Sequence, residues 1–525
     1  MLKKQLAVLT LAIINLTFYA CNTPQVEQPA KNKYNILFVS IDDLGPNLGA
    51  YENQYIHSPN LDAFAKTGMT FRNTYCQAAV CAPSRASLMT GLRPDSSHVW
   101  HLGDQFRVEH PNVVTMPQHF QKYGYHTVCI GKIFHNYMPD SISWDEPDLR
   151  PEQYKRSEWL KRDGETFYVN KETQRKQKIR RDEMVKKRPN YYADGWNNGP
   201  AWEMEDVHDS MYFDGAQTEL AKRSLTRLAK KDQPFFMALG YFRPHLPFAV
   251  PKKYWDLYDK DSIPLSRNPF LPEMAPVMSM NKMYELRGYD GFKNLQHPSV
   301  NVMAEDTARM LKMGYYASVS YIDTQFGKIL QHLKDEGLYD NTIIIVWGDH
   351  GWKLGEHNGW CKQTNYNIDI HVPMMVYSPN QANAGAQTFE ITELIDMFPS
   401  LCDLADIPAP SYMQGTSFVP LIENPTRPWK KAAFSQFHRR PKITPDGGRY
   451  MGYSIRTKTH HYVAWYRWNN ETHEAEDFVT HELYDNVKDP DENKNVVDDP
   501  KYGLIVTELK QQMKAGWKWA LPAKQ

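Results

Sequence analysis

The chain has 525 residues, of which 41% are hydrophobic and 13% aromatic, enough for a large buried core and for two structural units. Its 61 lysine and arginine residues balance 61 aspartate and glutamate residues, so no overall charge draws it to nucleic acid or to an anionic surface. These properties exclude a general nucleic-acid-binding protein and indicate a large globular one.

The N-terminus has the pattern of an export signal. Two lysines precede an apolar run that ends at Ala20 and is too short to span a membrane, which predicts a signal peptide over residues 1–20. Cys21 follows as at the cleavage site of a bacterial lipoprotein, and residues 21–33 have the composition of a flexible tether. We therefore expect an exported protein of the bacterial periplasm, outer membrane or cell surface, held to the membrane only by a lipid anchor.

Apolar runs of strand length follow in chain order at 35–41, 127–130, 235–239, 342–347 and 372–377. Their continuous hydrophobicity is typical of strands buried on both faces. Helical stretches lie between them at 60–67, 116–123, 217–230 and 311–336. This alternation predicts an α/β fold in which helices sandwich a large, mostly parallel sheet, with ligands bound at the carboxyl ends of the strands.

Two parts of the chain depart from this pattern. Within the segment 140–210, which has few apolar runs, the stretch 171–188 carries nine basic residues against three acidic ones. We expect a solvated helix face there, with a basic rim that gathers polyanions as the alternative. After residue 408, short strands are predicted at 451–457, 461–466 and 482–484, and a closing helix at 504–519.

The chain is therefore divided into two units beyond the tether. Residues 34–407 are expected to form the catalytic domain, because every candidate chemical group lies there. Residues 408–525 are expected to form a smaller C-terminal subdomain with an antiparallel sheet.

Candidate metal ligands stand at the ends of two predicted strands. Asp42 and Asp43 follow the first strand, and Asp349 and His350 follow the fourth. Three converging carboxylates repel one another unless a cation lies between them, and oxygen ligands indicate Ca²⁺ or Mg²⁺. His350 is an unusual ligand for so hard an ion. Any one of these aspartates alone is better explained as a helix N-cap.

Basic side chains follow other strands. Lys132 and His135 come after the second strand, His245 lies between two prolines after the third, and Lys362 ends the segment that Asp349 begins. Singly, each is explained as a structural or solvated residue. Together they would place cations around the oxygens of a bound ester anion and offer a proton to the departing alcohol.

The most informative stretch is CAPSRASLMTG, residues 81–91. A cysteine before a helix is by itself most often a buried thiol. Cys81, however, stands at a predicted helix N-terminus, where free N–H groups favour an anion, with Arg85 one turn later. The complete stretch resembles the maturation motif of the type I sulfatases, C-x-P-S-R followed by Thr-Gly.

That resemblance implies a modified nucleophile and a metal. Cys81 would be oxidised to Cα-formylglycine by a formylglycine-generating or anaerobic maturase enzyme, and its hydrate would attack sulfur. One Ca²⁺ is implied, with ligands Asp42, Asp43, Asp349, His350 and the modified Cys81. The metal and Arg85 would stabilise the attacking oxygen. The sulfate would be held by Lys132, His245 and Lys362, with His245 or Lys362 protonating the leaving sugar and His135 taking the proton that allows sulfate to leave.

Within the family, the chain resembles the iduronate-2-sulfatase branch and its bacterial polysaccharide-degrading relatives. The similarity is carried by segments that include 131–135, 239–245, 318–325, 349–362 and 451–457. Departures fall where the sugar would bind, at 96–101, 140–210 and 270–301, with His98, Trp100 and His101 as candidates for the pocket rim.

We therefore expect the substrate to be a sulfated, uronate-containing polysaccharide or its oligosaccharides, with ulvan-type algal glycan ahead of glycosaminoglycan fragments. One alternative is a phosphate or phosphonate monoester hydrolase of the same superfamily, against which the complete motif argues. Another is a catalytically inactive glycan-binding protein, whose mark would be loss of Cys81, Arg85 or a metal ligand. None of these residues is missing.

Overall fold

The computed structural model describes residues 34–135, 138–149, 151, 167–187, 199–300, 302–441, 444 and 446–523. The predicted signal peptide (1–20) and tether (21–33) lie outside the described residues. Within the described ranges, no helix is both long and apolar enough to cross a bilayer.

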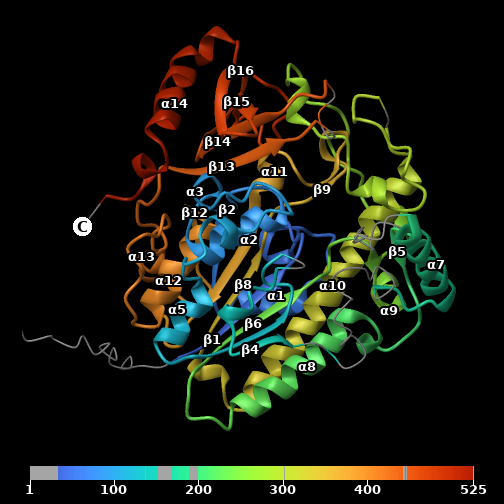
Figure 1. Ribbon diagram of the computed structural model, residues 1–525, viewed down its shortest axis with the longest axis vertical. Coiled ribbons are helices and arrows are strands. Elements are labelled where there is room, and N and C mark those ends of the chain that lie inside the picture. Colours follow the sequence, from blue (N-terminus) through green and yellow to red (C-terminus); the bar gives the residue numbers. More distant parts are fainter. Residues whose placement is uncertain are drawn as a thin grey trace, which may run out of the picture.

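An eight-stranded sheet forms the centre of the molecule (Figure 1). Its strand order is β12 (Gln387–Glu393), β2 (Met69–Tyr75), β11 (His371–Tyr377), β8 (Thr342–Gly348), β1 (Asn35–Ile41), β6 (Phe235–Tyr241), β3 (His126–Gly131) and β4 (Glu146–Leu149). All strands run parallel except β11, which pairs antiparallel with both neighbours. The predicted mostly parallel sheet is confirmed, and all five predicted strands are present.

The central strands are buried on both faces, as their hydrophobicity predicts. Along β1, Leu37, Val39 and Ile41 enter one apolar cluster, whereas Ile36 and Phe38 enter another on the opposite face. The first cluster is completed by α1 (Pro59–Ala65), α8 (Phe213–Leu228) and α10 (Glu305–Asp335). The second is completed by α2 (Cys81–Thr90), α5 (Met116–Lys122) and α12 (Met397–Leu404). Figure 1 shows these two helical layers on either side of the sheet.

Eight strands of the described residues were not predicted from the sequence, and β2, β12 and β13 are the longest of them. β2 carries partly exposed Arg72 and Asn73, and the edge strand β12 alternates exposed and buried residues. Such strands lack the continuous apolar run by which the central strands were found. β13 (Ala432–Arg439) likewise includes polar residues that are buried only in the tertiary structure.

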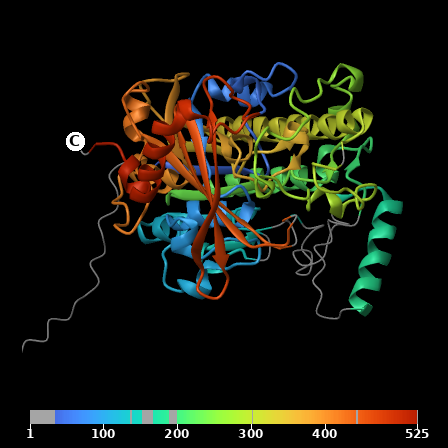
Figure 2. The same ribbon diagram turned by 90° about the horizontal axis from the view of Figure 1, so that it is seen from above.

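The C-terminal part contains the predicted antiparallel sheet. Its order is β13, β14 (Tyr450–Thr457), β15 (His460–Asn469) and β16 (Glu474–Asp485), and α14 (Gly503–Ala515) packs on it through a separate apolar cluster. Figure 2 shows the long β15–β16 hairpin reaching along one side of the main sheet. The domain boundary at residue 408 stays a prediction.

The basic stretch forms a helix, α7 (Lys171–Lys187), at the edge of the molecule (Figure 2). Its residues Lys171, Arg175, Lys176 and Lys178 are exposed, as expected for a solvated face. Arg188 lies outside the described residues, and the role of this stretch as a basic rim stays a prediction.

Candidate active site

The register of the parallel strands brings the candidate groups to one edge of the sheet. Ile41 at the end of β1 pairs with Gly348 at the end of β8, so Asp42 and Asp349 leave the sheet at the same level. In the same way, Gly131 at the end of β3 is level with Gly240 in β6, and Lys132 follows it.

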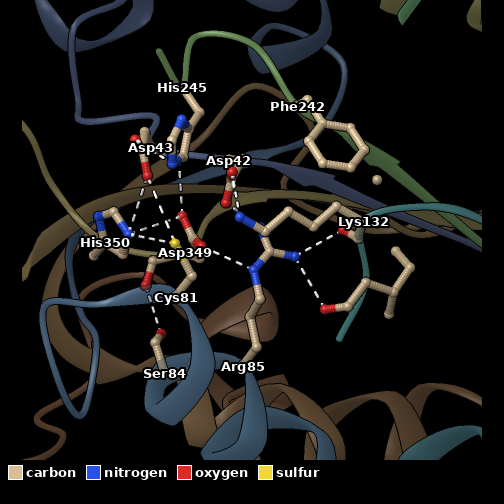
Figure 3. A network of polar contacts seen from close by, with 12 residues as sticks. Asp42, Asp43, Cys81, Ser84, Arg85, Lys132, Phe242, His245, Asp349 and His350 are labelled. Atoms are coloured by element: carbon tan, nitrogen blue, oxygen red, sulfur yellow. Dashed lines mark hydrogen bonds and ion pairs between the residues drawn. The ribbon is translucent and has the colours of Figure 1, made fainter. Parts of the chain in front are cut away.

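Cys81 is the first residue of α2, and its side chain points toward the carboxylates (Figure 3). The helix begins after the extended residue Val80 and ends at Gly91, whose φ of 73° is the left-handed conformation typical of a helix C-terminus. The Cys81 Sγ atom lies 3.2 Å from His350 Nε2 and 3.8 Å from Asp43 Oδ1. Burial and the nearby Asp42 carboxylate raise the pKa of the Cys81 thiol, so the unmodified side chain is not prepared to act as a thiolate.

Aspartate, cysteine and histidine side chains form two overlapping, buried groups of possible metal ligands. In the first group, one ligand atom each from Asp43, Cys81, Asp349 and His350 lies within 4.8 Å of the others. The second group consists of Asp42, Asp43 and His245. All three aspartates and His350 are fully buried. Asp43 adopts a left-handed backbone conformation with φ of 61°, and its amide donates to Asp349 Oδ1 at 3.0 Å.

The orientation of His350 fits a metal ligand. Its Nδ1 lies 3.0 Å from the carbonyl oxygen of Gly351, which can only accept, so Nδ1 carries the hydrogen. The lone pair of Nε2 then faces Asp43 Oδ1 at 3.2 Å, and two acceptors at this distance require a cation or a proton between them. This oxygen-rich, buried set therefore fits one divalent cation of the Ca²⁺ type.

Arg85 holds the carboxylates of Asp42 and Asp349 in place. Its guanidinium donates to Asp349 Oδ2 at 2.8 Å and to Asp42 Oδ1 at 2.9 Å, and also to the carbonyls of Lys132 and Ile133. Burial alone would raise the pKa of Asp349, but the Arg85 charge holds it well below its usual range. Because Arg85 is fully buried and donates to both carboxylates, it fixes the orientation of Asp42 and Asp349.

Two lysines line the cluster and keep their charge. Lys132 Nζ lies 2.5 Å from Asp42 Oδ2, and Lys362 Nζ lies 2.6 Å and 2.8 Å from the two oxygens of Asp43. Burial disfavours a charged ammonium group, but the adjacent aspartates raise the pKa of both lysines above the ordinary value. The site thus offers two fixed cations to an anionic substrate.

His135 and His245 are buried beside these lysines. Burial and the Lys132 charge lower the pKa of His135, so its imidazole is neutral and can accept a proton. Its Nδ1 has no hydrogen-bond partner within the part of the chain that the structure describes. The Nδ1 of His245 lies 2.7 Å from the carbonyl oxygen of Leu246, which leaves Nε2 facing the site.

Glu285 is a site residue that the sequence analysis missed. Its Oε1 lies 3.1 Å from His245 Nε2, and its carboxylate contacts Lys362 Nζ at 3.1 Å and 3.2 Å. Burial raises its pKa to about 7, although Lys362 acts in the opposite direction. Glu285 lies in a segment without strand or helix periodicity, so no local pattern marks it.

The structure thus brings together all ten predicted site residues. Their chemistry suits the transfer of an anionic group, because cations surround the space beside Cys81 and two histidines can exchange protons there. The rim candidates His98, Trp100 and His101 gather in a neighbouring pocket.

Comparisons with known proteins agree with this geometry. The family model described as Sulfatase matches residues 34–407, and one described as N-sulphoglucosamine sulphohydrolase, C-terminal, matches residues 355–518. Iduronate 2-sulfatase of Mus musculus is 32% identical over 92% of this chain and 94% of its own length. Ulvan-active sulfatase of Formosa agariphila is 26% identical over 95% of this chain and 84% of its own length.

A solved structure supports the fold. A protein in complex with its substrate D-glucosamine-2-N,6-O-disulfate superposes with a TM-score of 0.69. The match covers 93% of this chain and 98% of that chain at 21% identity. The two proteins therefore share the central sheet with its helices and the C-terminal antiparallel sheet.

Proposed function

Because this chain belongs to the sulfatase family and hydrolyses sulfate esters, we propose that its substrate is a sulfated, uronate-containing polysaccharide or an oligosaccharide released from one. The observation that carries the proposal is the position of the complete motif 81–91, which places Cys81 against buried carboxylates and two lysines. A sulfated carbohydrate is the substrate class that the related sulfatases support.

The family generally uses formylglycine and a metal ion. Here Asp42, Asp43, Asp349, His350 and residue 81 would hold one Ca²⁺. Bound there, the ion and the hydrated formylglycine at residue 81 would supply a polarised oxygen nucleophile for attack on sulfur. A formylglycine-generating or anaerobic maturase is the partner that this modification requires.

The side chains of the chain itself bind the sulfate and move protons. Lys132 and Lys362 bind the sulfate oxygens, because each ammonium group is kept charged by an aspartate beside it. Arg85 acts through the Asp42 and Asp349 carboxylates that it orders.

The proton transfers are assigned to side chains beside the two lysines. Either His245 or Lys362, which both contact Glu285, would donate a proton to the leaving sugar oxygen. His135 is neutral and buried, which suits acceptance of a proton from residue 81 when sulfate leaves.

Two polymer classes are the leading substrates. Ulvan-type oligosaccharides are placed first, because the segments expected at the sugar rim depart from the iduronate-2-sulfatase pattern and a relative is an ulvan-active sulfatase. Glycosaminoglycan fragments with 2-sulfated iduronate are second, supported by 32% identity to iduronate 2-sulfatase over nearly the whole chain.

The test is a panel assay with protein co-expressed with a maturase. Sulfate release from defined ulvan and heparan or dermatan oligosaccharides is followed by ion chromatography, with the Cys81→Ala variant as the control. We expect sulfate release from ulvan oligosaccharides. Turnover of heparan or dermatan disaccharides alone would reverse the order, and activity confined to small aryl sulfates would refute the polysaccharide proposal.

A phosphate or phosphonate monoester hydrolase remains the second candidate, because a metal with an activated nucleophile can also attack phosphorus. Parallel assays with 4-nitrophenyl sulfate, 4-nitrophenyl phosphate and a phenylphosphonate monoester decide between them. We expect the sulfate ester to be hydrolysed most efficiently.

We also propose that the protein is a lipoprotein of the periplasm or outer surface, on the basis of the export signal and Cys21. Metabolic labelling with a radioactive fatty acid should mark the wild-type chain and leave the Cys21→Ala variant unlabelled. Labelling of both chains, or of neither, would contradict the anchor.

A further inference from the structure

A pocket of about 480 Å³ lies outside the cluster of buried carboxylates. Its lining includes His98, Trp100, Asp104, His438, Trp468 and His473. These residues come from the loop after α3 (Pro94–Ser97), from β13 and from the β15–β16 hairpin (Figure 2). The volume is typical of a site for a small molecule or a sugar unit.

Aromatic rings form one wall of this pocket. The rings of His98 and Trp100 are stacked with centroids 5.3 Å apart, and the His473 ring lies 4.9 Å from Trp100. Trp468 contacts Trp100 edge-on at 5.3 Å. The faces of such rings carry partial negative charge and attract the C–H groups on one side of a pyranose ring.

A buried polar atom lies in the same wall. The His438 side chain is only 3% exposed, and its Nδ1 lies 2.5 Å from His101 Nε2. Its Nε2 has no hydrogen-bond partner among the residues that the structure places. An unpaired buried polar atom is costly, so a ligand hydroxyl at this position would be stabilising.

The imidazoles of His101 and His438 in this pocket are neutral. Burial lowers the pKa of His101 to about 4 and of His438 to about 2, and Arg440 and Arg449 contribute in the same direction. Asp104 accepts from the amides of Trp100 and His101, and Glu109 lies 3.5 Å from His98. Neutral ring nitrogens of this kind can exchange hydrogen bonds with sugar hydroxyls.

The segments that line the pocket contact the segments that carry the active-site residues in two places. Phe106, next to the lining residue Gln105, stacks on Phe134 at 5.7 Å, and His135 follows directly. On the other side, His438 precedes Arg439, which donates to the carbonyl of Gln363, the residue after Lys362. A chain bound at the sulfate site could therefore continue into this pocket.

We propose that this pocket is a second sugar subsite, which binds the sugar adjacent to the sulfated one. The proposal rests on the proposed function, since it assumes an oligosaccharide substrate. Aromatic contact with one face of the sugar and a hydrogen bond to His438 would set the preference for an oligosaccharide over a small sulfate ester.

The test compares long and short substrates in two variants. His473→Asn removes a ring while tolerating the left-handed backbone at that position, where φ is 58°, and Trp100→Leu keeps apolar volume. Glu471→Ala, in the same hairpin but outside the pocket lining, is the matched control. Substrates are tetrasaccharides from ulvan and heparan sulfate, and 4-nitrocatechol sulfate.

We expect the loss of kcat/KM on a tetrasaccharide to exceed the loss on 4-nitrocatechol sulfate by roughly fivefold to tenfold, mainly through KM. The control should leave both values unchanged. Equal losses on both substrates, or no loss, would overturn the subsite.

Calorimetry separates this result from a failure of the proposed function. In a Cys81→Ala background, binding of the same tetrasaccharide should weaken by a similar factor when His473→Asn is added. If the wild-type enzyme released no sulfate from oligosaccharides, the proposed function would fail. Even in that case, equal binding of the tetrasaccharide with and without His473→Asn in calorimetry would refute the subsite.

Discussion

At the scale of single residues, the active site is a set of compensated buried charges. Arg85 neutralises Asp42 and Asp349, while Lys362 pairs with Asp43. Removal of one partner from such a buried pair leaves an uncompensated charge and is strongly destabilising. Burial and the Asp42 carboxylate raise the pKa of the Cys81 thiol, so the unmodified thiol is a poor nucleophile.

Formylglycine at residue 81 is the first prediction. Conversion of –CH₂SH to –CHO removes about 18 Da from the peptide that carries this residue. Peptide mass spectrometry after co-expression with a maturase should show the loss. A fully active preparation that contains only the unmodified thiol would contradict the mechanism.

A second prediction concerns Glu285, which contacts both His245 and Lys362. Glu285→Ala should lower kcat on a sugar sulfate by roughly tenfold to a hundredfold, the range for partners that orient a functional histidine. The loss should be smaller on 4-nitrocatechol sulfate, because its good leaving group needs little help from a proton donor.

Glu285→Gln should restore most of this activity, since the amide oxygen can still accept a hydrogen bond from His245. The exposed Glu273→Ala provides the matched control. The same loss on both substrates would assign Glu285 a purely structural role.

At the scale of elements, the ends of parallel strands place the groups that react. β1, β3 and β8 deliver Asp42, Lys132 and Asp349 to one edge because their registers end at the same level. The second sheet reaches the same region through the residues that follow Lys362. Asn367, at the start of α11 (Asn367–Ile370), donates its amide to Glu492, which also binds His461 of β15.

The third prediction is a pH dependence at this contact between elements. Burial would raise the pKa of Glu492, but His461 and the hydrogen bonds lower it from 4.5 to about 2. A carboxyl group whose pKa is lower in the folded state than in the unfolded state stabilises the fold at pH values above the unfolded pKa. This stabilisation is lost as the pH falls from about 4.5 toward 2. The full effect corresponds to about 3 kcal/mol at neutral pH.

Urea denaturation of wild type and Glu492→Gln at pH 7 and pH 3 measures this contribution. The difference between the two proteins should fall by about half between pH 7 and pH 3. The exposed Glu474→Gln should not differ from wild type. A difference that does not shrink in acid would show that the Glu492 charge is not responsible.

At the scale of the whole molecule, the candidate metal site joins segments that are far apart in the sequence. The residues that could hold a cation follow β1, begin α2 and follow β8, so a bound cation would link two strands of the sheet to a helix on one of its faces. The C-terminal sheet is tied to the main sheet by a second buried network, in which Glu393 of β12 pairs with Arg93 and Lys430.

The fourth prediction is that the cation stabilises the fold as well as supporting turnover. A ligand that binds only the folded state at a hundredfold excess over Kd adds about 2.7 kcal/mol. Chelated protein should lose activity and melt at lower temperature, and Ca²⁺ should restore both better than Mg²⁺. Asp43→Asn should show a reduced thermal shift. Full activity and unchanged melting after exhaustive chelation would contradict the site.

Local sequence determined the central elements and the motif. β1 was predicted with its observed bounds, because a strand buried on both faces needs an unbroken apolar run. The C-x-P-S-R stretch and the strand-end aspartates were found because their spacing is local, and the shared edge followed from the rules for parallel sheets.

Only the tertiary structure decided how distant groups pair. Lys362 and Asp43 are 319 positions apart, and Glu285 and His438 lie in segments with no distinguishing pattern. β2 and β12 were not predicted from the sequence, because partly exposed strands mix polar and apolar residues. The periodicity of apolar side chains and the spacing of motifs indicate which face of an element is buried. The element that packs against that face is determined by the packing of the whole chain.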